Sequence, residues 1–477
     1  MFYILYNFYY ELRAWPVIPR CRRGGDVACL LQKRSVSSPP GGSARRSPWL
    51  AGVAIIAALL GAAGLARIGP ALSLALNLAL PGAEGLLTPF LDAVELDQVL
   101  VEVQGRALAA DLYRPPVPRA ALLLVHGLSR AGRRHPELVR LARLLARHGL
   151  LVLVPQFEGL AAFRLSGREV IEVGAALRLL GARSSSVGVA GFSFGAGPAL
   201  LAAADAPELA LTASFGGYAD LRDVIVYLTT GMHEFGGRRF AQQPEEYNRW
   251  KLLALLGGFV QDEGDRGVLD DIAARKLADP GGDVSALEAD LGPEGRAVIA
   301  LVLNRREERV GALLAALPSG ARAAMERLSP HAAVGRLPGR LLIAHGAGDA
   351  SIPFTQSLRL AEASHGRAAA VILETFEHTG PQPLWRSIGS RLRDGVRLLR
   401  LADGLLQPVR HPVAPAVAVR HSSTNPVTAA RTAPRSSVRF SAATVPTICG
   451  ALHVRARAVT AGLRTRRTAC QSSRRAL

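Results

Sequence analysis

The segment Val187-Gly-Val-Ala-Gly-Phe-Ser-Phe-Gly-Ala-Gly197 carries the strongest local pattern of the chain. An apolar strand-like run leads into Gly191-Phe192-Ser193-Phe194-Gly195, and a run of small helix-forming residues, 196–204, follows. This order places a serine on a sharp strand-to-helix turn, where flanking glycines let the two backbones approach closely. The pattern predicts that Ser193 is an exposed nucleophile, and the alternative is a glycine-rich turn with an incidental serine.

Two further side chains are needed, because a serine hydroxyl is a weak nucleophile without an oriented base. Asp349 lies in a turn after the apolar run 341–344, and His378 follows the strand-like run 369–376. The carboxyl ends of parallel strands share one edge of a sheet, so residues distant in sequence can meet there. We therefore predict a triad of Ser193, Asp349 and His378, with Asp220 and Asp223 as alternative acids.

A fourth element is Leu122-Leu-Leu-Val-His-Gly-Leu-Ser129, a strand that ends in small residues. Backbone N–H groups near a nucleophile can stabilise the negative charge of a tetrahedral intermediate. The N–H groups of Leu128 and Phe194 are predicted to form this oxyanion hole.

Short apolar runs alternate with amphipathic helical segments along the chain, which is typical of an α/β fold with a mostly parallel sheet covered by helices on both faces. The expected strands are 99–103, 108–113, 121–125, 150–154, 186–190, 209–214, 341–344 and 369–376. The interval 220–338 has helical patterns and no good strand, and is predicted to be a helical cap inserted after strand 6.

With these motifs, the sequence resembles the serine hydrolases of the α/β-hydrolase fold, over roughly residues 95–401. The resemblance rests on His126-Gly127, on the turn at Ser193, on the Gly346-x-x-Asp349-x-x-x-Pro353 turn and on His378. It implies an eight-stranded, mostly parallel sheet and cofactor-free, metal-free hydrolysis of an ester or amide bond in a small-molecule or lipid-like acyl substrate, as in carboxylesterases and lipases. The loop 155–159 departs from the family, whose members often have an Asp and a glycine-rich turn there.

Two other functions remain open at this point. An acyltransferase could use the same triad, and a non-catalytic binding protein could retain the fold.

Other polar and aromatic residues receive simpler interpretations. His126 and His345 are expected to fix loops, His233, Glu234 and His331 to lie on the surface of the cap, and Phe192 and Phe194 to serve packing. Arg130, Arg133 and Arg134 either attract an anionic substrate or form a solvated helix start. No His, Asp, Glu or Cys cluster has metal-ligand spacing, so no metal site is predicted.

The net charge of +19 is confined to the ends of the chain. Residues 1–47 carry a basic surplus of six, residues 404–477 carry twelve arginines and no acid, and the part between is nearly neutral. A nucleic-acid partner is therefore not predicted. The segments 1–47 and 405–477 have no hydrophobic period and are predicted to be disordered.

A stretch of eighteen uncharged residues, 49–66, follows Arg45 and Arg46. Its length approaches that of a spanning helix, and the basic flank predicts a cytoplasmic N-terminus. We expect residues 48–83 to form a single-pass transmembrane or signal-anchor region, with the catalytic domain on the exported side. A cleaved signal peptide and a buried Ala-rich helix are the alternatives. The catalytic domain would then comprise 86–219 and 339–404, interrupted by the cap at 220–338.

Overall fold

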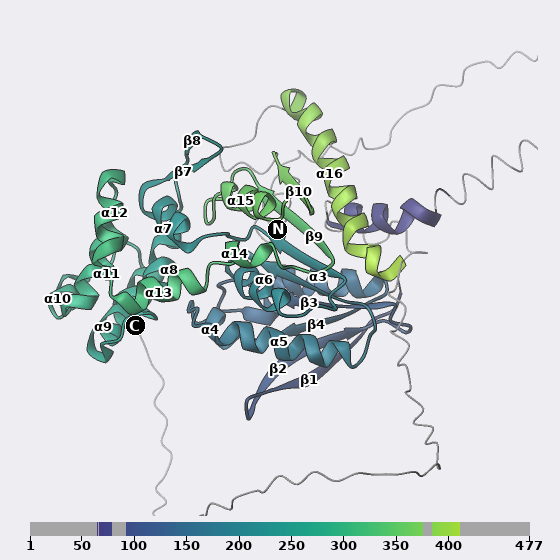
Figure 1. Ribbon diagram of the computed structural model, residues 1–477, viewed down its shortest axis with the longest axis horizontal. Coiled ribbons are helices and arrows are strands. Elements are labelled where there is room, and N and C mark those ends of the chain that lie inside the picture. Colours follow the sequence, from purple (N-terminus) through teal and green to yellow (C-terminus); the bar gives the residue numbers. More distant parts are fainter. Residues whose placement is uncertain (1–63, 65, 79–91, 375–383, 411–477) are drawn as a thin grey trace, which may run out of the picture. The chain divides into compact units, whose positions relative to one another are not determined.

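The computed structural model describes residues 64, 66–78, 92–374 and 384–410. His378, residues 1–47 and residues 411–477 lie outside these residues, as do most of the predicted membrane region and residues 86–91 of the predicted catalytic domain. The prediction that disorder begins at 405 is wrong, because the last helix of the fold continues to Arg410 and buries Leu405 and Leu406 in the core. Figure 1 shows the arrangement of the described helices and strands.

The centre of the fold is an eight-stranded sheet with the order β1-β2-β4-β3-β5-β6-β9-β10. β1 and β2 pair antiparallel, β2 and β4 pair antiparallel, and the remaining pairs are parallel. The predicted mostly parallel, eight-stranded sheet is thereby confirmed. The strands are β1 Glu95–Val103, β2 Arg106–Arg114, β3 Ala120–Val125, β4 Leu150–Pro155, β5 Val187–Phe192, β6 Leu211–Phe215, β9 Arg340–Gly346 and β10 Ala368–Leu373.

Helices cover both faces of this sheet (Figure 1). They are α3 Pro136–Arg147, α4 Glu158–Ala161, α5 Arg168–Gly181, α6 Ala196–Ala204, α15 Thr355–Ala363 and α16 Leu384–Arg410, with short 3₁₀ turns η3 Gly132–Arg134 and η4 Ser193–Gly195. The central strands are apolar at every position because both of their faces are buried. In β3, for example, Leu123 points to the core under α5 and α6, whereas Leu122 and Leu124 point to the core under α3 and α16.

Between β6 and β9 the chain forms a largely helical region. Its helices are α7 Leu221–Thr230, α8 Glu246–Gly257, α9 Glu263–Ala278, α10 Ser285–Ala289, α11 Pro293–Leu303, α12 Glu307–Ala316, α13 Ser319–Arg327 and α14 His331–Val334. The expectation that this interval holds no strand is wrong, because β7 Met232–Phe235 and β8 Arg238–Ala241 pair as an antiparallel hairpin. Gly236 and Gly237 both have positive φ in its turn, a conformation that glycine adopts without strain.

A helix formed by residues 66–78 packs against the main body, beside α16 in Figure 1. Its residues Ala71, Leu74 and Leu78 are buried in the same core as Leu138 and Leu141 of α3. Arg140 of α3 donates hydrogen bonds to the carbonyls of Asn77 and Leu78 at 2.9 and 3.5 Å. This part of the predicted membrane region is therefore in contact with protein, and within the described residues no helix is long and apolar enough to cross a bilayer.

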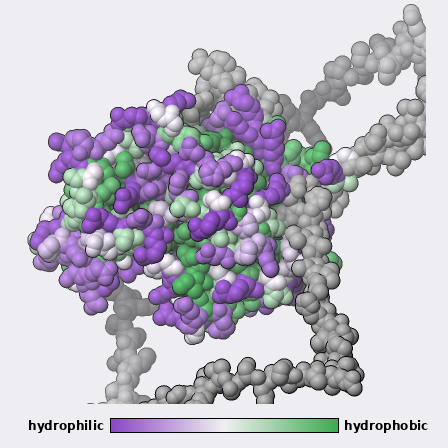
Figure 2. All heavy atoms as spheres, viewed as in Figure 1, coloured by the Kyte–Doolittle hydropathy of each residue, from purple (hydrophilic) through white to green (hydrophobic). Residues whose placement is uncertain are grey.

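Polar and charged residues cover most of the surface shown in Figure 2, with apolar residues between them. The buried apolar residues form two cores, one on each face of the sheet, and the core under α5 and α6 continues into the helical region.

Candidate active site

Ser193 stands on the turn between β5 and α6, in a backbone conformation with φ of +51°. Positive φ is uncommon for a residue with a side chain, costs about 1–3 kcal/mol and persists only where the surroundings impose it. The adjacent glycines show what imposes it. A Cβ at Gly191 would lie 2.5 Å from Cα of Ala196, and a Cβ at Gly195 would lie 2.1 Å from the carbonyl oxygen of His126. The sharp strand-to-helix turn at Ser193 is therefore present.

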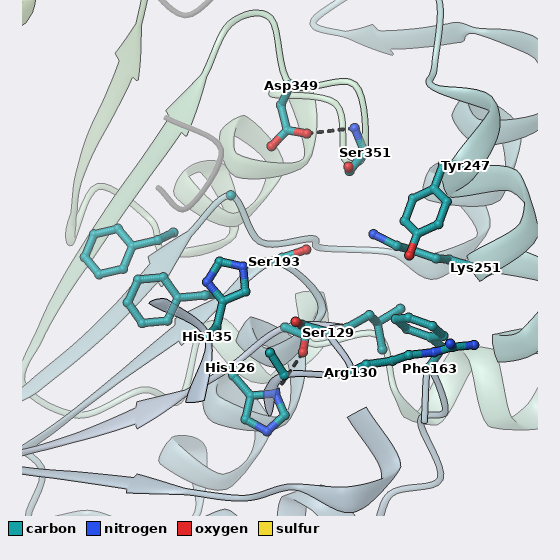
Figure 3. A pocket seen from close by; sticks show the side chains of 16 residues that line it. His126, Ser129, Arg130, His135, Phe163, Ser193, Tyr247, Lys251, Asp349 and Ser351 are labelled. Carbon is teal, nitrogen blue, oxygen red and sulfur yellow. Dashed lines mark hydrogen bonds between the residues drawn. The ribbon is translucent and has the colours of Figure 1, made fainter. Parts of the chain in front are cut away.

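A pocket of about 410 Å³ lies at the carboxyl edge of the sheet, and Ser193, Asp349 and Leu128 all line it. Its walls come from the loops after β3, β5, β6 and β9 and from α8 of the helical region. Figure 3 shows Ser193 and Asp349 from these different loops facing the same space. The structure thus brings together two of the three predicted triad positions, which are far apart in sequence.

The third predicted triad residue, His378, lies outside the described residues. β10 ends at Leu373, and its partner in the parallel register is Gly346, three residues before Asp349. The role of His378 stays a prediction.

The loop after β3 passes directly against the serine turn. A Cβ on Gly127 would lie 2.9 Å from Cβ of Ser193 and 3.0 Å from the carbonyl oxygen of Phe192, so only glycine fits. Leu128, the next residue, lines the pocket, and Phe194 begins the turn into α6 with its ring buried against Tyr218. The two predicted oxyanion residues thus lie on adjoining loops, and their role stays a prediction.

Asp349 is held by its own turn. Its Oδ1 accepts hydrogen bonds from the backbone N–H groups of Ser351 and Ile352 at 2.8 and 3.1 Å, and its Oδ2 lies 3.4 Å from Nε2 of His345. Burial raises the pKa of Asp349, but His345 and the two backbone N–H groups outweigh this and leave the pKa below its usual value. A carboxylate that stays charged in a partly buried site suits the orientation and stabilisation of an imidazolium.

The two alternative acids are engaged elsewhere. Asp220 caps α7 by accepting from the backbone N–H of Arg222 at 2.7 Å. Asp223 forms an ion pair with Arg359 at 2.9 Å and lines a separate pocket from the one that contains Ser193. Neither aspartate lines the pocket that contains Ser193, whereas Asp349 does.

His126 and His345 have the contacts of loop-fixing residues. The ring of His126 is buried, with Nδ1 2.8 Å from the carbonyl of Gly127 and Nε2 accepting from the N–H of Phe157 at 3.1 Å. It therefore ties the loop after β3 to the loop after β4. His345 is fully buried and bridges Ser357 in α15 to the carbonyl of Ile352, at 2.6 and 2.8 Å.

Other expectations for polar residues have mixed outcomes. His331 is exposed, whereas the expectation that His233 lies on the surface is wrong: it is buried among the rings of Tyr227, Phe240 and Phe354. Arg133 is not a solvated cation, because it pairs with buried Asp111 at 3.1 Å. The packing roles of the two phenylalanines are confirmed: Phe192 stacks on Phe215 and Phe194 contacts Tyr218.

Several residues of the pocket have no local signal in the sequence. Phe163 follows α4, His135 precedes α3, and Tyr247 and Lys251 come from α8. Burial lowers the pKa of His135, assisted by Lys251 and opposed by Glu137. Within the described part of the chain, no group of three His, Cys, Asp or Glu residues could hold a metal ion.

No family model matches the chain, and no curated protein matches it in sequence. Among solved structures it is similar to the acylaminoacyl peptidase of Pyrococcus horikoshii (TM-score 0.38, 14% identity, covering 68% of this chain and 43% of that one). It is also similar to a puromycin-hydrolysing peptidase of Mycobacterium tuberculosis (0.38, 16%, covering 66% and 38%) and to the esterase domain of a Rhodothermus marinus protein (0.35, 18%, covering 66% and 98%). The matched region thus spans less than half the length of either peptidase.

The chain has an α/β-hydrolase fold. Its own sheet order and the serine turn after β5 show this fold. Similarities as low as those above say nothing about the reaction or the substrate. The fold hosts many activities, so the function has to be argued from the pocket.

Proposed function

We propose that this chain is a serine hydrolase that cleaves an ester or amide bond through an acyl-enzyme intermediate. The observation that carries the proposal is the position of Ser193, held at φ of +51° on the wall of a pocket that it shares with the charged Asp349. Backbone strain of this kind at a pocket wall is a recognised mark of a functional residue.

The proposed reaction begins when Oγ of Ser193 attacks the acyl carbon and the imidazole of His378 takes the hydroxyl proton. The N–H groups of Leu128 and Phe194 stabilise the oxyanion, and Asp349 orients His378 and stabilises its positive charge. The proton then passes to the leaving alcohol or amine as its bond to the acyl carbon breaks. Water, deprotonated by the same histidine, releases the acid and restores Ser193.

Two features of the site support this assignment of roles. Among the described residues, the hydroxyl of Ser193 accepts or donates no hydrogen bond that would divert it, whereas Asp349 is fixed by three contacts. The pocket volume of about 410 Å³ is within the range of small-molecule sites.

Labelling with a fluorophosphonate probe tests the nucleophile. The wild-type chain should be labelled at Ser193, and Ser193→Ala should lose both the label and the turnover of 4-nitrophenyl butyrate while unfolding at the same temperature. A folded wild-type protein that takes up no label would support a binding protein instead. Product analysis with an added alcohol would reveal an acyltransferase, because the acyl group would then appear on the alcohol.

We also propose that the uncharged stretch 49–66 anchors the protein in a membrane, with the catalytic domain on the exported side. The support is the sequence pattern, and the packed helix 66–78 would join the anchor closely to the catalytic domain. Alkaline carbonate extraction of membranes that contain the full chain should leave it in the pellet. Recovery in the supernatant would contradict the proposal.

A further inference from the structure

One side of the pocket carries two cations arranged around an aromatic ring. Nζ of Lys251 lies 5.9 Å from the ring centroid of Phe163, and Cζ of Arg130 lies 5.7 Å from the same centroid. Nζ of Lys251 also lies 4.5 Å from the ring centroid of Tyr247. Figure 3 shows these four side chains grouped on one side of the pocket that also contains Ser193.

Neither cation forms an ion pair or a side-chain hydrogen bond with another described residue, and both lie against these rings. Arg130 is exposed, whereas Lys251 is partly buried. Other buried or partly buried cations of the chain do have polar partners: Arg133 pairs with Asp111, and Arg249 donates to the carbonyl of Asn304 at 3.2 Å. Removing a cation from water without a counter-charge costs free energy. The cost at Lys251 is visible as a pKa lowered chiefly by burial, with Glu245 and Asp349 acting in the opposite direction.

The carboxylate of Asp349 lines the same pocket but is already engaged. Its Oδ1 accepts two backbone N–H groups and its Oδ2 faces His345. It forms no ion pair with Lys251 or Arg130, and in the proposed triad its remaining acceptor capacity serves His378. A bound anion would therefore supply the counter-charge for the two cations.

Phe163 itself is unusual. It is buried and has φ of +58°, one of four described non-glycine residues with positive φ, and Ser193 is another. The fold therefore holds the ring of Phe163, against which both cations lie, in the pocket that also contains Ser193.

Resting on the proposed hydrolase function, we propose that Arg130 and Lys251 form an anion subsite that selects small esters bearing a carboxylate near the scissile carbonyl. The guanidinium offers paired donors to a carboxylate and the ammonium adds a point charge. The carboxylate takes no part in bond making: Oγ of Ser193 forms the new bond to the acyl carbon, and the bond to the leaving oxygen breaks. Its role is to hold the ester in the pocket.

Two matched ester pairs test this proposal. In the first pair, 4-nitrophenyl hydrogen glutarate carries the charge on the acyl side, and its methyl ester is neutral. In the second, 4-acetoxybenzoate carries the charge on the leaving group, and methyl 4-acetoxybenzoate is neutral. We expect kcat/KM to favour the anionic member of at least one pair by about tenfold or more, since hydrogen bonds to charged groups are the stronger ones. The pair that shows the preference identifies the side on which the natural substrate carries its charge.

Variants of the two cations connect this preference to the subsite. Lys251→Met and Arg130→Gln should each reduce the ratio of kcat/KM for the anionic ester to kcat/KM for the neutral ester by about tenfold, mainly through KM. Lys251→Arg keeps the positive charge and should retain part of this preference. Lys276→Met is the matched control, because Lys276 also lies over a ring, that of Trp250 at 5.1 Å, but does not line this pocket. Its ratio should equal that of the wild type. Equal rates for charged and neutral esters, or a preference that survives both cation variants, would overturn the subsite.

A binding measurement separates this proposal from the hydrolase itself. Ser193→Ala should bind monomethyl glutarate but not dimethyl glutarate in calorimetric titration, and Lys251→Met in that background should abolish the binding. If no ester is turned over and no probe reacts while this binding is present, the subsite stands and the hydrolase assignment fails. If neutral esters are hydrolysed while monomethyl glutarate does not bind, the subsite fails and the hydrolase stands.

Discussion

Nε2 of His345 lies 3.4 Å from Oδ2 of Asp349, in the turn that follows β9. The same nitrogen lies 2.8 Å from the carbonyl of Ile352, and Nδ1 lies 2.6 Å from the hydroxyl of Ser357. The geometry fits Nε2–H donating to the carbonyl of Ile352 and Nδ1 accepting from the hydroxyl of Ser357. A buried histidine therefore ties α15 to the turn that presents Asp349 to the pocket.

Asp349→Asn should reduce kcat by about a thousandfold or more, because an amide cannot stabilise the positive charge of the catalytic imidazole. The steady-state rate with 4-nitrophenyl acetate measures the loss. Asp223→Asn is the matched variant, since Asp223 lies in another pocket and pairs with Arg359. An equal loss in Asp223→Asn, or full activity in Asp349→Asn, would remove Asp349 from the triad.

Mild acid should destabilise the protein, because unfolding lets His126 take up a proton. Burial lowers its pKa from 6.5 to about 4, so the folded state keeps the ring neutral while the unfolded state takes up a proton. The stabilising contribution is full above the unfolded pKa and is lost as the pH falls toward 4. Between pH 7 and pH 5 we expect the free energy of unfolding to fall by about 1–2 kcal/mol from this group.

Urea unfolding at the two pH values measures this dependence, and His126→Gln is the informative variant. Its side-chain carbonyl can accept from Phe157 N–H as Nε2 does, but it does not titrate. Between pH 7 and pH 5, the free energy of unfolding should fall by about 1–2 kcal/mol less in the variant than in the wild type. An unchanged slope would show that His126 is not the titrating group.

Gly127→Ala should impair catalysis without unfolding the protein. The new Cβ would lie 2.9 Å from Cβ of Ser193, so the loop that carries Leu128 has to move away from the serine. We expect kcat to fall by about tenfold to a hundredfold, as when oxyanion donors are displaced. Gly181→Ala, at the end of α5, meets nothing within 4 Å and should leave kcat unchanged. Similar kcat values for both variants would contradict the close approach at Gly127.

Asp111→Asn should be strongly destabilising, by about 3 kcal/mol, because it leaves the partly buried guanidinium of Arg133 without its counter-charge. Asp97→Asn is the comparison. Its ion pair with Arg114 is about half exposed, so its loss should cost under about 1 kcal/mol. Denaturant unfolding of both variants checks the difference, and equal costs would show that burial of the Arg133 pair has no consequence.

The elements that could be predicted from sequence have local causes. Continuous apolar runs indicated β3, β4 and β5 because both of their faces are buried, and the glycines at 191 and 195 indicated the turn at Ser193. The β7–β8 hairpin was missed because its strands have four residues each and no clear alternation. The Gly236-Gly237 pair was its available signal.

The eight strands of the main sheet, the serine turn and the aspartate turn could be read from the sequence alone, since each depends on residues that are neighbours in the chain. The pocket that Ser193 and Asp349 share with Arg130, Phe163 and Lys251 comes from the packing of distant segments. Only the tertiary structure decided that His233 is buried, because Phe354, one of the rings around it, comes from a distant part of the chain. The burial of His233 and the unpaired charges in the pocket arise when segments distant in the chain pack together. Local hydrophobic patterns and turn motifs carry no information about such packing.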